Sequence, residues 1–317
     1  MKLLACLAAI LAIFAGSAAV YMVNRPNTLA EEVSVVLDRG VTVRRMSENL
    51  EKAGVISSSL LFRIVVRGLG ADKHLKAGEY MFPPRINMMQ VANQLLKGEV
   101  YYRKITLPEG LTSVQMIELI KNEPNLAGEI TVPVSEGSML PETYSFSKGD
   151  SRNSIIVQAQ KAMEKVLDIV WADNQVPVLK NKEQLLILAS IVEKETGLPE
   201  ERRDVAAVFV NRLNKGMMLQ TDPTVIYALT LGQSDLGRPL YTKDLAVDSP
   251  YNTYRNYGLP PKPICNPGKE AIIAAANPSD ADYLFFVASG YGGHRFARSL
   301  PEHNENVAAY RKILRNK

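Results

Sequence analysis

The sequence predicts an α+β protein with one N-terminal membrane-spanning helix and two further domains. Three observations support this prediction. Residues 3–23 carry no charged side chain, helix-like and strand-like patterns alternate after residue 30 without an internal repeat, and 317 residues suffice for about two domains. Because 46% of the residues are hydrophobic and 22% are charged, a disordered or collagen-like chain is excluded.

The uncharged segment at the N-terminus is long enough, as a helix, to cross about 30 Å of hydrocarbon. Lys2 precedes it and residues 24–26 end it. We therefore expect residues 1–24 to form a single-pass anchor in the cytoplasmic (inner) membrane, with residues 25–317 in the periplasm. The alternative is a cleaved signal peptide, whose apolar core is usually shorter, roughly 7–15 residues.

The charged residues and the cysteines exclude several classes of function. The 37 basic and 33 acidic residues leave a net charge of only +4, which does not indicate nucleic-acid binding. The two cysteines, Cys6 and Cys265, cannot build a disulfide framework or a cysteine-rich metal site. The three histidines are far apart in the sequence and lack metal-ligand spacing. We therefore expect no metal, no cofactor and no nucleic acid.

A small α+β module is predicted between residues 30 and 105. Alternation of apolar residues predicts its strands, and apolar residues on one face predict its helices. The strands are expected at 34–37, 76–82 and 100–107, and the helices at 43–53, 57–68 and 87–97.

A larger domain is predicted after the turn at residues 108–110. Its helices are expected after Thr112 and over 151–171, 183–196, 199–214, 269–276 and 301–315, with a strand at 283–288. Residues 216–267 are rich in Pro, Gly, Asn and Tyr and are expected to be mostly loop, and a loop this long usually forms a binding or catalytic surface. Residues 290–293 follow a strand and no helix begins after them, so we interpret them as a hairpin turn and not as a nucleotide-binding loop.

The helix expected near residues 184–197 is the most informative one. It is apolar nearly all round until its last turn, which predicts that it is buried. Glu193 lies on the face of Leu186 and Ala189, and Glu195 lies about 200° away. Both stand at the negative end of the helix dipole, and burial there favours the protonated form that a general acid needs. The residues alone leave open that both are exposed charges.

The sequence LASIVEKET at residues 188–196 resembles the signature of the membrane-bound endolytic murein transglycosylases, the YceG-like family. Other stretches resemble family motifs in the same order. These are KAGEY at 76–80, EG at 136–137, LPETY at 140–144, VFVNRL at 208–213, LQTDPTVIY at 219–227, YNTY at 251–254, GLPP at 258–261, NPG at 266–268 and GHRF at 293–296. The resemblance covers nearly the whole chain.

This resemblance implies a LysM-like module over 30–105 and a catalytic domain over 106–317. It implies that Glu193, the first Glu of the signature, is the catalytic acid/base and that Glu195 supports it. The expected reaction cleaves MurNAc-β-1,4-GlcNAc bonds within peptidoglycan glycan strands and leaves 1,6-anhydro-MurNAc ends. Such cleavage would limit the length of nascent strands, with peptidoglycan synthases as partners.

Polar and aromatic side chains in the loop motifs are candidates for sugar binding. Amides and carboxylates can bond to hydroxyl and N-acetyl groups, and tyrosine rings can stack on pyranose faces. The candidates are Asn211, Gln220, Asp222, Tyr227, Tyr251, Asn252 and Tyr254. For each of them, a bond that fixes a loop or a place in the core is the alternative interpretation.

Two other functions compete with this one. A non-catalytic peptidoglycan-binding protein would need only the LysM-like module, but it would not need the Glu193 signature. A muramidase that uses water normally needs two carboxylates, and Asp222 or Glu142 could supply the second. Glu193 and Glu195 lie on different helix faces, which favours a scheme with one carboxylate.

Overall fold

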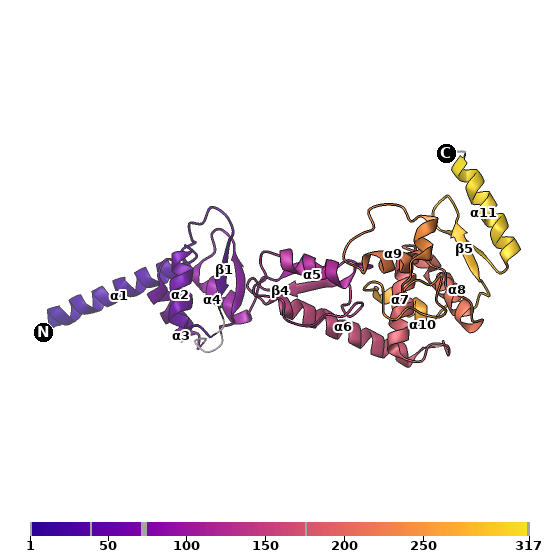
Figure 1. Cartoon of the computed structure of the whole chain (residues 1–317). Coiled ribbons are helices and arrows are strands. Elements are labelled where there is room, and N and C mark those ends of the chain that lie inside the picture. The colour runs from indigo at the N-terminus through magenta and orange to yellow at the C-terminus, as the bar shows by residue number, and fades with distance from the viewer. Residues whose placement is uncertain (1, 39, 71–74, 175, 316–317) are drawn as a thin grey trace. The chain divides into compact units, whose positions relative to one another are not determined.

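The computed structural model describes residues 2–38, 40–70, 75–174 and 176–315. The chain divides into two compact units, residues 1–103 with 145–150 and residues 104–144 with 151–317. Helices and strands are mixed along the chain. The colours of Figure 1 follow the chain from indigo at the N-terminus to yellow at the C-terminus. Each unit has its own hydrophobic core.

The first unit contains a long N-terminal helix, two antiparallel strands and three shorter helices. In chain order they are α1 (Lys2–Asn24), β1 (Val33–Leu37), α2 (Val43–Lys52), α3 (Ser59–Gly68), β2 (Gly78–Phe82) and α4 (Met88–Lys97). β1 pairs with β2, and buried side chains such as Leu37, Leu50, Phe62 and Phe82 form the core between sheet and helices. The three expected helices and the strands expected at 34–37 and 76–82 are confirmed with small shifts of their ends, and the strand expected at 100–107 is present as the shorter strand Arg103–Thr106.

The three short helices begin where the sequence supplies a capping side chain. Thr42, Ser58 and Asn87 each accept a hydrogen bond from the backbone N–H three residues further on. This bond satisfies one of the donors that the first turn of a helix leaves free. Gly98 ends α4 at φ 70°, in the left-handed region that glycine adopts at low cost.

The first unit also contains an ion pair whose carboxylate is buried. Glu79 in β2 is fully buried, and its carboxylate accepts hydrogen bonds from the Arg103 guanidinium at 2.8 and 2.9 Å. Ser34 Oγ donates to the same carboxylate. Because Arg103 stabilises the charged form, the pKa of Glu79 is lowered from its ordinary value of 4.5. The pair ties β2 to the start of β3 (Arg103–Thr106).

The predicted membrane-spanning helix is wrong. Residues 2–24 do form the helix α1, but within the described part of the chain no helix is both long and apolar enough to cross a membrane. The same finding contradicts the expected single-pass membrane localisation with a periplasmic catalytic domain.

The second unit is built mainly from helices. They are α5 (Ser113–Asn122), α6 (Arg152–Ala172), α7 (Lys182–Glu195), α8 (Arg202–Asn214), α9 (Asp222–Thr230), α10 (Lys269–Ala276) and α11 (Leu300–Arg315), with short 3-10 turns η1 (Pro199–Glu201) and η2 (Thr242–Ala246). The strands are β4 (Thr143–Phe146), which pairs with β3, and the antiparallel pair of β5 (Phe285–Ala288) and β6 (His294–Ala297). The boundary between the units falls within β3 and β4.

Two expectations for the second unit have clear outcomes. The hairpin turn is confirmed, because Ser289 N–H donates to the Gly293 carbonyl at 2.8 Å between β5 and β6. The expected loop at 216–267 contains α9 and η2, so that expectation was partly wrong. α9 begins at Asp222 and Pro223, and proline is favoured in the first turn of a helix although it also marks turns.

We predict that Glu79→Gln destabilises the first unit by about 2 kcal/mol, because Arg103 loses its charged partner. Since the folded pKa of Glu79 is lowered, its stabilisation is complete above the ordinary value of 4.5 and is lost as the pH falls through the folded value. Urea unfolding of both proteins between pH 3 and pH 7 measures this. Glu99→Gln removes an exposed pair with Lys97 and should change stability by less than about 0.5 kcal/mol. Equal effects of the two substitutions would contradict the prediction.

Candidate active site

Helix α7 carries both carboxyls of the signature. It begins after Asn181, whose side chain accepts a hydrogen bond from the Gln184 N–H at 2.9 Å. Every residue from 185 to 192 is buried, and α7 packs against α6, α8, α9 and α10. Figure 1 shows α8 and α10 close to α7. Glu193 and Glu195 lie in its last turn, at the negative end of the helix dipole.

Glu193 lies against the backbone of Gly268. Its Oε2 accepts a hydrogen bond from the Gly268 N–H at 2.9 Å. Burial raises the pKa of the Glu193 carboxyl, the bond from Gly268 lowers it, and the nearby charge of Glu109 raises it. Arg202, which pairs with Glu109 at 3.7 Å, supplies a positive charge that lowers it. The neighbours of Glu193 are therefore a backbone amide and other charged side chains.

Glu195 has a different set of neighbours. The Thr221 hydroxyl donates a hydrogen bond to Glu195 Oε1. Burial raises the pKa of Glu195 to about 7, although this bond lowers it. Asp222 raises the pKa further, while the positive charges of His294 and Arg212 lower it. A carboxyl that titrates near neutral pH can both donate and accept a proton there, as an acid–base catalyst must.

Thr221 is placed at the N-cap of α9, yet its hydroxyl makes no capping bond. The hydroxyl bonds to Glu195 instead. A threonine at this position ordinarily satisfies an N–H group of the first helical turn. The Thr221 hydroxyl therefore links the start of α9 to the Glu195 carboxyl.

Glu195 opens onto a pocket of about 200 Å³. The pocket wall combines polar groups with aromatic rings, a mixture suited to a polar ring with apolar faces. It is formed by Glu195, Phe209, Arg212, Leu219, Gln220, Asp222, Tyr254 and Phe286. The Tyr254 hydroxyl donates to Asp222 Oδ1 at 2.7 Å, so these two side chains are held together at the wall.

Gln220 reaches this wall through an unusual backbone conformation. Its φ is 50°, in the left-handed region that costs a non-glycine residue roughly 1–2 kcal/mol. Two successive bonds maintain the conformation. The Gln220 N–H donates to the Thr253 carbonyl at 3.1 Å, and the Thr221 N–H donates to the Thr253 hydroxyl at 3.1 Å. Strained backbone of this kind is concentrated at functional sites.

The structure brings only some of the predicted sugar-binding residues together with Glu195. Gln220, Asp222 and Tyr254 line the pocket. The residues that do not line it are Asn211, Tyr227, Tyr251 and Asn252.

Asn211 and Asn252 hold backbone segments in place. Asn211 Nδ2 donates to the Tyr283 carbonyl at 3.0 Å, just before β5. Asn252 is fully buried, and its Nδ2 donates to the carbonyls of Leu245 and Val247 at 2.9 and 2.8 Å. Buried amides need such partners, and these bonds correspond to the loop-fixing interpretation.

Tyr227 and Tyr251 pack together beside the half-buried carboxyl of Glu136. Their ring centroids are 4.8 Å apart, and the Tyr227 hydroxyl donates to Glu136 Oε2 at 3.2 Å. Glu136 also accepts a hydrogen bond from the Ser113 N–H at 2.8 Å. Burial raises the pKa of Glu136, and the bonds from Ser113, Tyr227 and Gly137 lower it.

Five side chains that contact the pocket or its acid were not selected from the sequence. They are Phe209, Arg212, Leu219, Thr221 and Phe286. The first four lie inside motifs at 208–213 and 219–227, so the motifs themselves were the available signal. Phe286 lies in β5, outside every motif, and only the packing of the hairpin brings it to the pocket. Within the described residues, no group of three or more His, Cys, Asp or Glu side chains could hold a metal ion.

Comparisons with known proteins give a consistent picture. The model of the YceG-like family matches residues 35–309. An endolytic murein transglycosylase of Bacillus subtilis (strain 168) is 33% identical over 312 residues, which covers 88% of this chain and 84% of that protein. An endolytic murein transglycosylase of Streptococcus pneumoniae (strain ATCC BAA-255 / R6) is 30% identical, and the match covers 88% of this chain and 58% of that protein.

A solved structure has a similar fold. The 2.6 Å crystal structure of a yceG-like protein from Listeria monocytogenes aligns with a TM-score of 0.53 and 32% sequence identity. The alignment covers 87% of this chain and 99% of that chain.

We predict that Thr221→Ala raises the titration midpoint of Glu195 above about 7. The hydroxyl stabilises the carboxylate, so its loss should move the midpoint upward by about one pH unit. NMR titration of protein with ¹³C-labelled Glu side-chain carboxyls measures the midpoint. The control is Thr230→Ala, because this hydroxyl bonds to the Ile226 carbonyl at the other end of α9. A midpoint that falls or stays constant in Thr221→Ala would refute the role given to this bond.

Proposed function

Because the chain belongs to the YceG-like family, we propose that it is an endolytic lytic transglycosylase of peptidoglycan. It cleaves MurNAc-β-1,4-GlcNAc bonds within glycan strands, leaves 1,6-anhydro-MurNAc ends and so limits the length of nascent strands. The observation that carries the chemistry is Glu195, a carboxyl with a pKa near 7 on the wall of a polar pocket. Its chemistry is that of a carbon–oxygen lyase.

One carboxyl suffices for this reaction. Protonated Glu195 gives its proton to the glycosidic oxygen, and the bond from that oxygen to C1 of MurNAc breaks. The Glu195 carboxylate then takes the proton of the MurNAc C6 hydroxyl, whose oxygen forms the new bond to C1. The ring closes, the carboxyl regains its proton, and no water is consumed. A pKa near the working pH makes both proton transfers accessible.

We assign the acid–base role to Glu195, although the family resemblance implied Glu193. Glu195 lines the pocket together with Gln220, Asp222 and Tyr254. Glu193 is bonded to the backbone N–H of Gly268 and neighbours Glu109, an arrangement that suits a structural tie between α7 and the start of α10. The assignment to Glu193 remains the competing prediction, and the two carboxyls can be tested separately.

Asp222 favours a muramidase as the second candidate function, because it adds a second carboxylate to the pocket wall. Two carboxylates are what a hydrolase that uses water normally requires. The contacts of Asp222 suggest a different role. Its Oδ1 is occupied by the Tyr254 hydroxyl, and its charge raises the pKa of Glu195, which keeps the acid protonated for the transglycosylase reaction.

We also propose that residues 30–105 form a LysM-like module that holds the glycan strand and performs no chemistry, and that residues 106–317 form the catalytic domain. The support is the order of elements, in which the antiparallel strands β1 and β2 enclose α2 and α3. A peptidoglycan synthase, which makes the strands that this enzyme shortens, is the protein partner that we propose.

We predict that Glu195→Gln lowers the release of 1,6-anhydro-muropeptides from purified murein by at least ~100-fold, because the amide cannot donate the proton. Glu193→Gln is the matched control in the same helical turn, and its activity should fall less than about tenfold. Mass spectrometry of the products and thermal unfolding of each variant are the measurements. An intact fold is expected for both, since a neutral amide replaces a group that burial makes costly to ionise.

Each other outcome has a definite meaning. If Glu193→Gln is inactive and Glu195→Gln is active, Glu193 is the acid. Products one water heavier than the anhydro form would identify a muramidase. Full activity of both variants would exclude the catalytic mechanism proposed for α7.

A further inference from the structure

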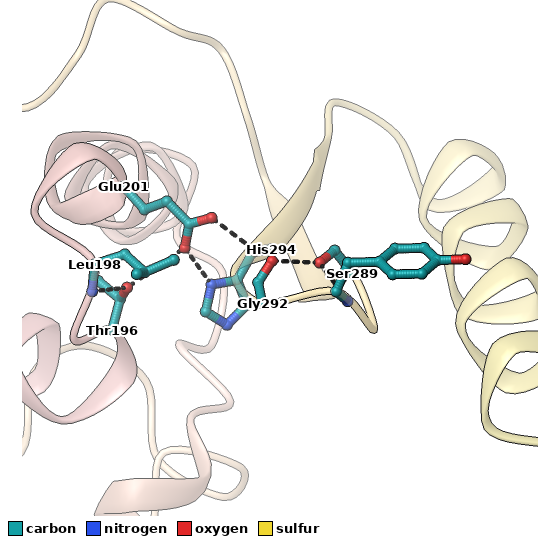
Figure 2. A network of polar contacts seen from close by, with 7 residues as sticks. Thr196, Leu198, Glu201, Ser289, Gly292 and His294 are labelled. Atoms are coloured by element: carbon teal, nitrogen blue, oxygen red, sulfur yellow. Dashed lines mark hydrogen bonds and ion pairs between the residues drawn. The ribbon is translucent and has the colours of Figure 1, made fainter. Parts of the chain in front are cut away.

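Glu201, in the 3-10 turn η1 that follows α7, is hydrogen-bonded to His294, the first residue of β6. Glu201 Oε1 accepts a hydrogen bond from the His294 backbone N–H at 2.7 Å, and Oε2 lies 2.7 Å from His294 Nδ1. Only 14% of the Glu201 side chain and 19% of the His294 side chain are exposed. Figure 2 shows the carboxylate reaching from η1 to the first residue of β6.

The hairpin is shaped to admit this carboxylate. A Cβ atom on Gly293 would lie 2.2 Å from Glu201 Oε1, and Gly293 has a φ of 72°. Both features exclude a side chain at this position without a shift of the backbone or of Glu201. The turn between β5 and β6 is therefore fitted to Glu201 by backbone geometry as well as by hydrogen bonds.

Two separate contacts connect the pair to Glu195. Thr196, the residue after Glu195, donates from its hydroxyl to Glu201 Oε2 at 3.4 Å. The ring of Phe286, which lines the Glu195 pocket, meets the His294 ring edge-on at 5.1 Å between centroids. His294 is thus placed behind the Phe286 side of the pocket wall, and in its protonated form it lowers the pKa of Glu195.

We propose that His294, held by Glu201, is a positioning residue for the catalytic carboxyl, and that its imidazolium form stabilises the Glu195 carboxylate left after proton donation. This proposal rests on the proposed function for its catalytic meaning. The imidazolium charge acts between the two proton transfers, when Glu195 has lost its proton and has not yet taken one from the sugar hydroxyl.

Other groups facing Glu195 belong to different elements. Arg212 on α8 also favours the carboxylate, Asp222 on α9 opposes it, and the Thr221 hydroxyl donates to it. Tyr254 lies across the pocket. These groups are unchanged when His294 is replaced, so its contribution can be measured as a difference.

The experiment is the NMR titration of the ¹³C-labelled Glu195 carboxyl in the full chain. His294→Gln removes the charge, so the midpoint of Glu195 should rise by about 0.5–1 pH unit. The alkaline limb of murein cleavage should move upward by the same amount, because Glu195 stays protonated to higher pH. The matched control is His303→Gln, since His303 stacks on Phe285 of the same hairpin at 5.2 Å and should leave the midpoint unchanged.

Glu201→Gln distinguishes an effect of the His294 charge from an effect of the hydrogen bonds that hold His294 in place. The amide oxygen can accept from the His294 N–H and the amide nitrogen can donate to Nδ1 of a neutral imidazole, so both bonds survive. Loss of the carboxylate favours that neutral form. This variant should therefore also raise the Glu195 midpoint, but by less than His294→Gln does, because loss of the Glu201 charge itself favours the Glu195 carboxylate. Its thermal unfolding should stay close to wild type.

The outcomes are decisive in both directions. A folded His294→Gln protein with an unchanged Glu195 midpoint overturns the proposal. The Glu201–His294 contact then has only a structural role. If His294→Gln fails to fold, an unchanged midpoint in Glu201→Gln overturns it, and a raised midpoint supports it. A wild-type protein that releases no anhydro products would instead reject the proposed function, and the titration would still measure the coupling.

Discussion

The burial of α7 is the constraint on which the candidate active site depends. Residues 185–192 are buried among four other helices, so the helix cannot shift without exposing apolar surface at roughly 25 cal/mol per Å². Its last turn is thereby held where water has limited access. Burial is the largest cause that raises the pKa of both Glu193 and Glu195.

The pocket beside Glu195 is assembled from segments that are far apart in the sequence. Gln220 and Thr221 are bonded to Thr253, and Thr224 shares a hydroxyl bond with Thr253 at 2.8 Å. These short polar side chains join the start of α9 to the loop that carries Tyr254. The loops around the site are therefore held by a dense set of buried hydrogen bonds, and not by regular sheet or helix pairing.

Much of the fold was predictable because periodicity and capping are local properties. The helices expected at 43–53, 57–68 and 87–97 are present as α2, α3 and α4, capped by Thr42, Ser58 and Asn87. The turn before β6 was expected because residues 290–293 follow a strand and precede no helix. α9 was not predicted, because Asp222 and Pro223 fit a turn as well as a first helical turn. β4 and β6 have only four residues each, and strands this short acquire their identity from the partner strand.

The sequence by itself determined that α7 is buried and that its two carboxyls lie on different faces, because both properties follow from the period of one helix. It also determined the family, through motifs whose order survives along the chain. Tertiary structure alone decided which carboxyl meets the pocket, since Thr221, Asp222 and Phe286 come from other elements. It also decided that Asn211 and Asn252 bond to backbone carbonyls and lie outside the pocket wall. A side chain's partners depend on which distant segments pack beside it, and no local pattern of residues encodes that packing.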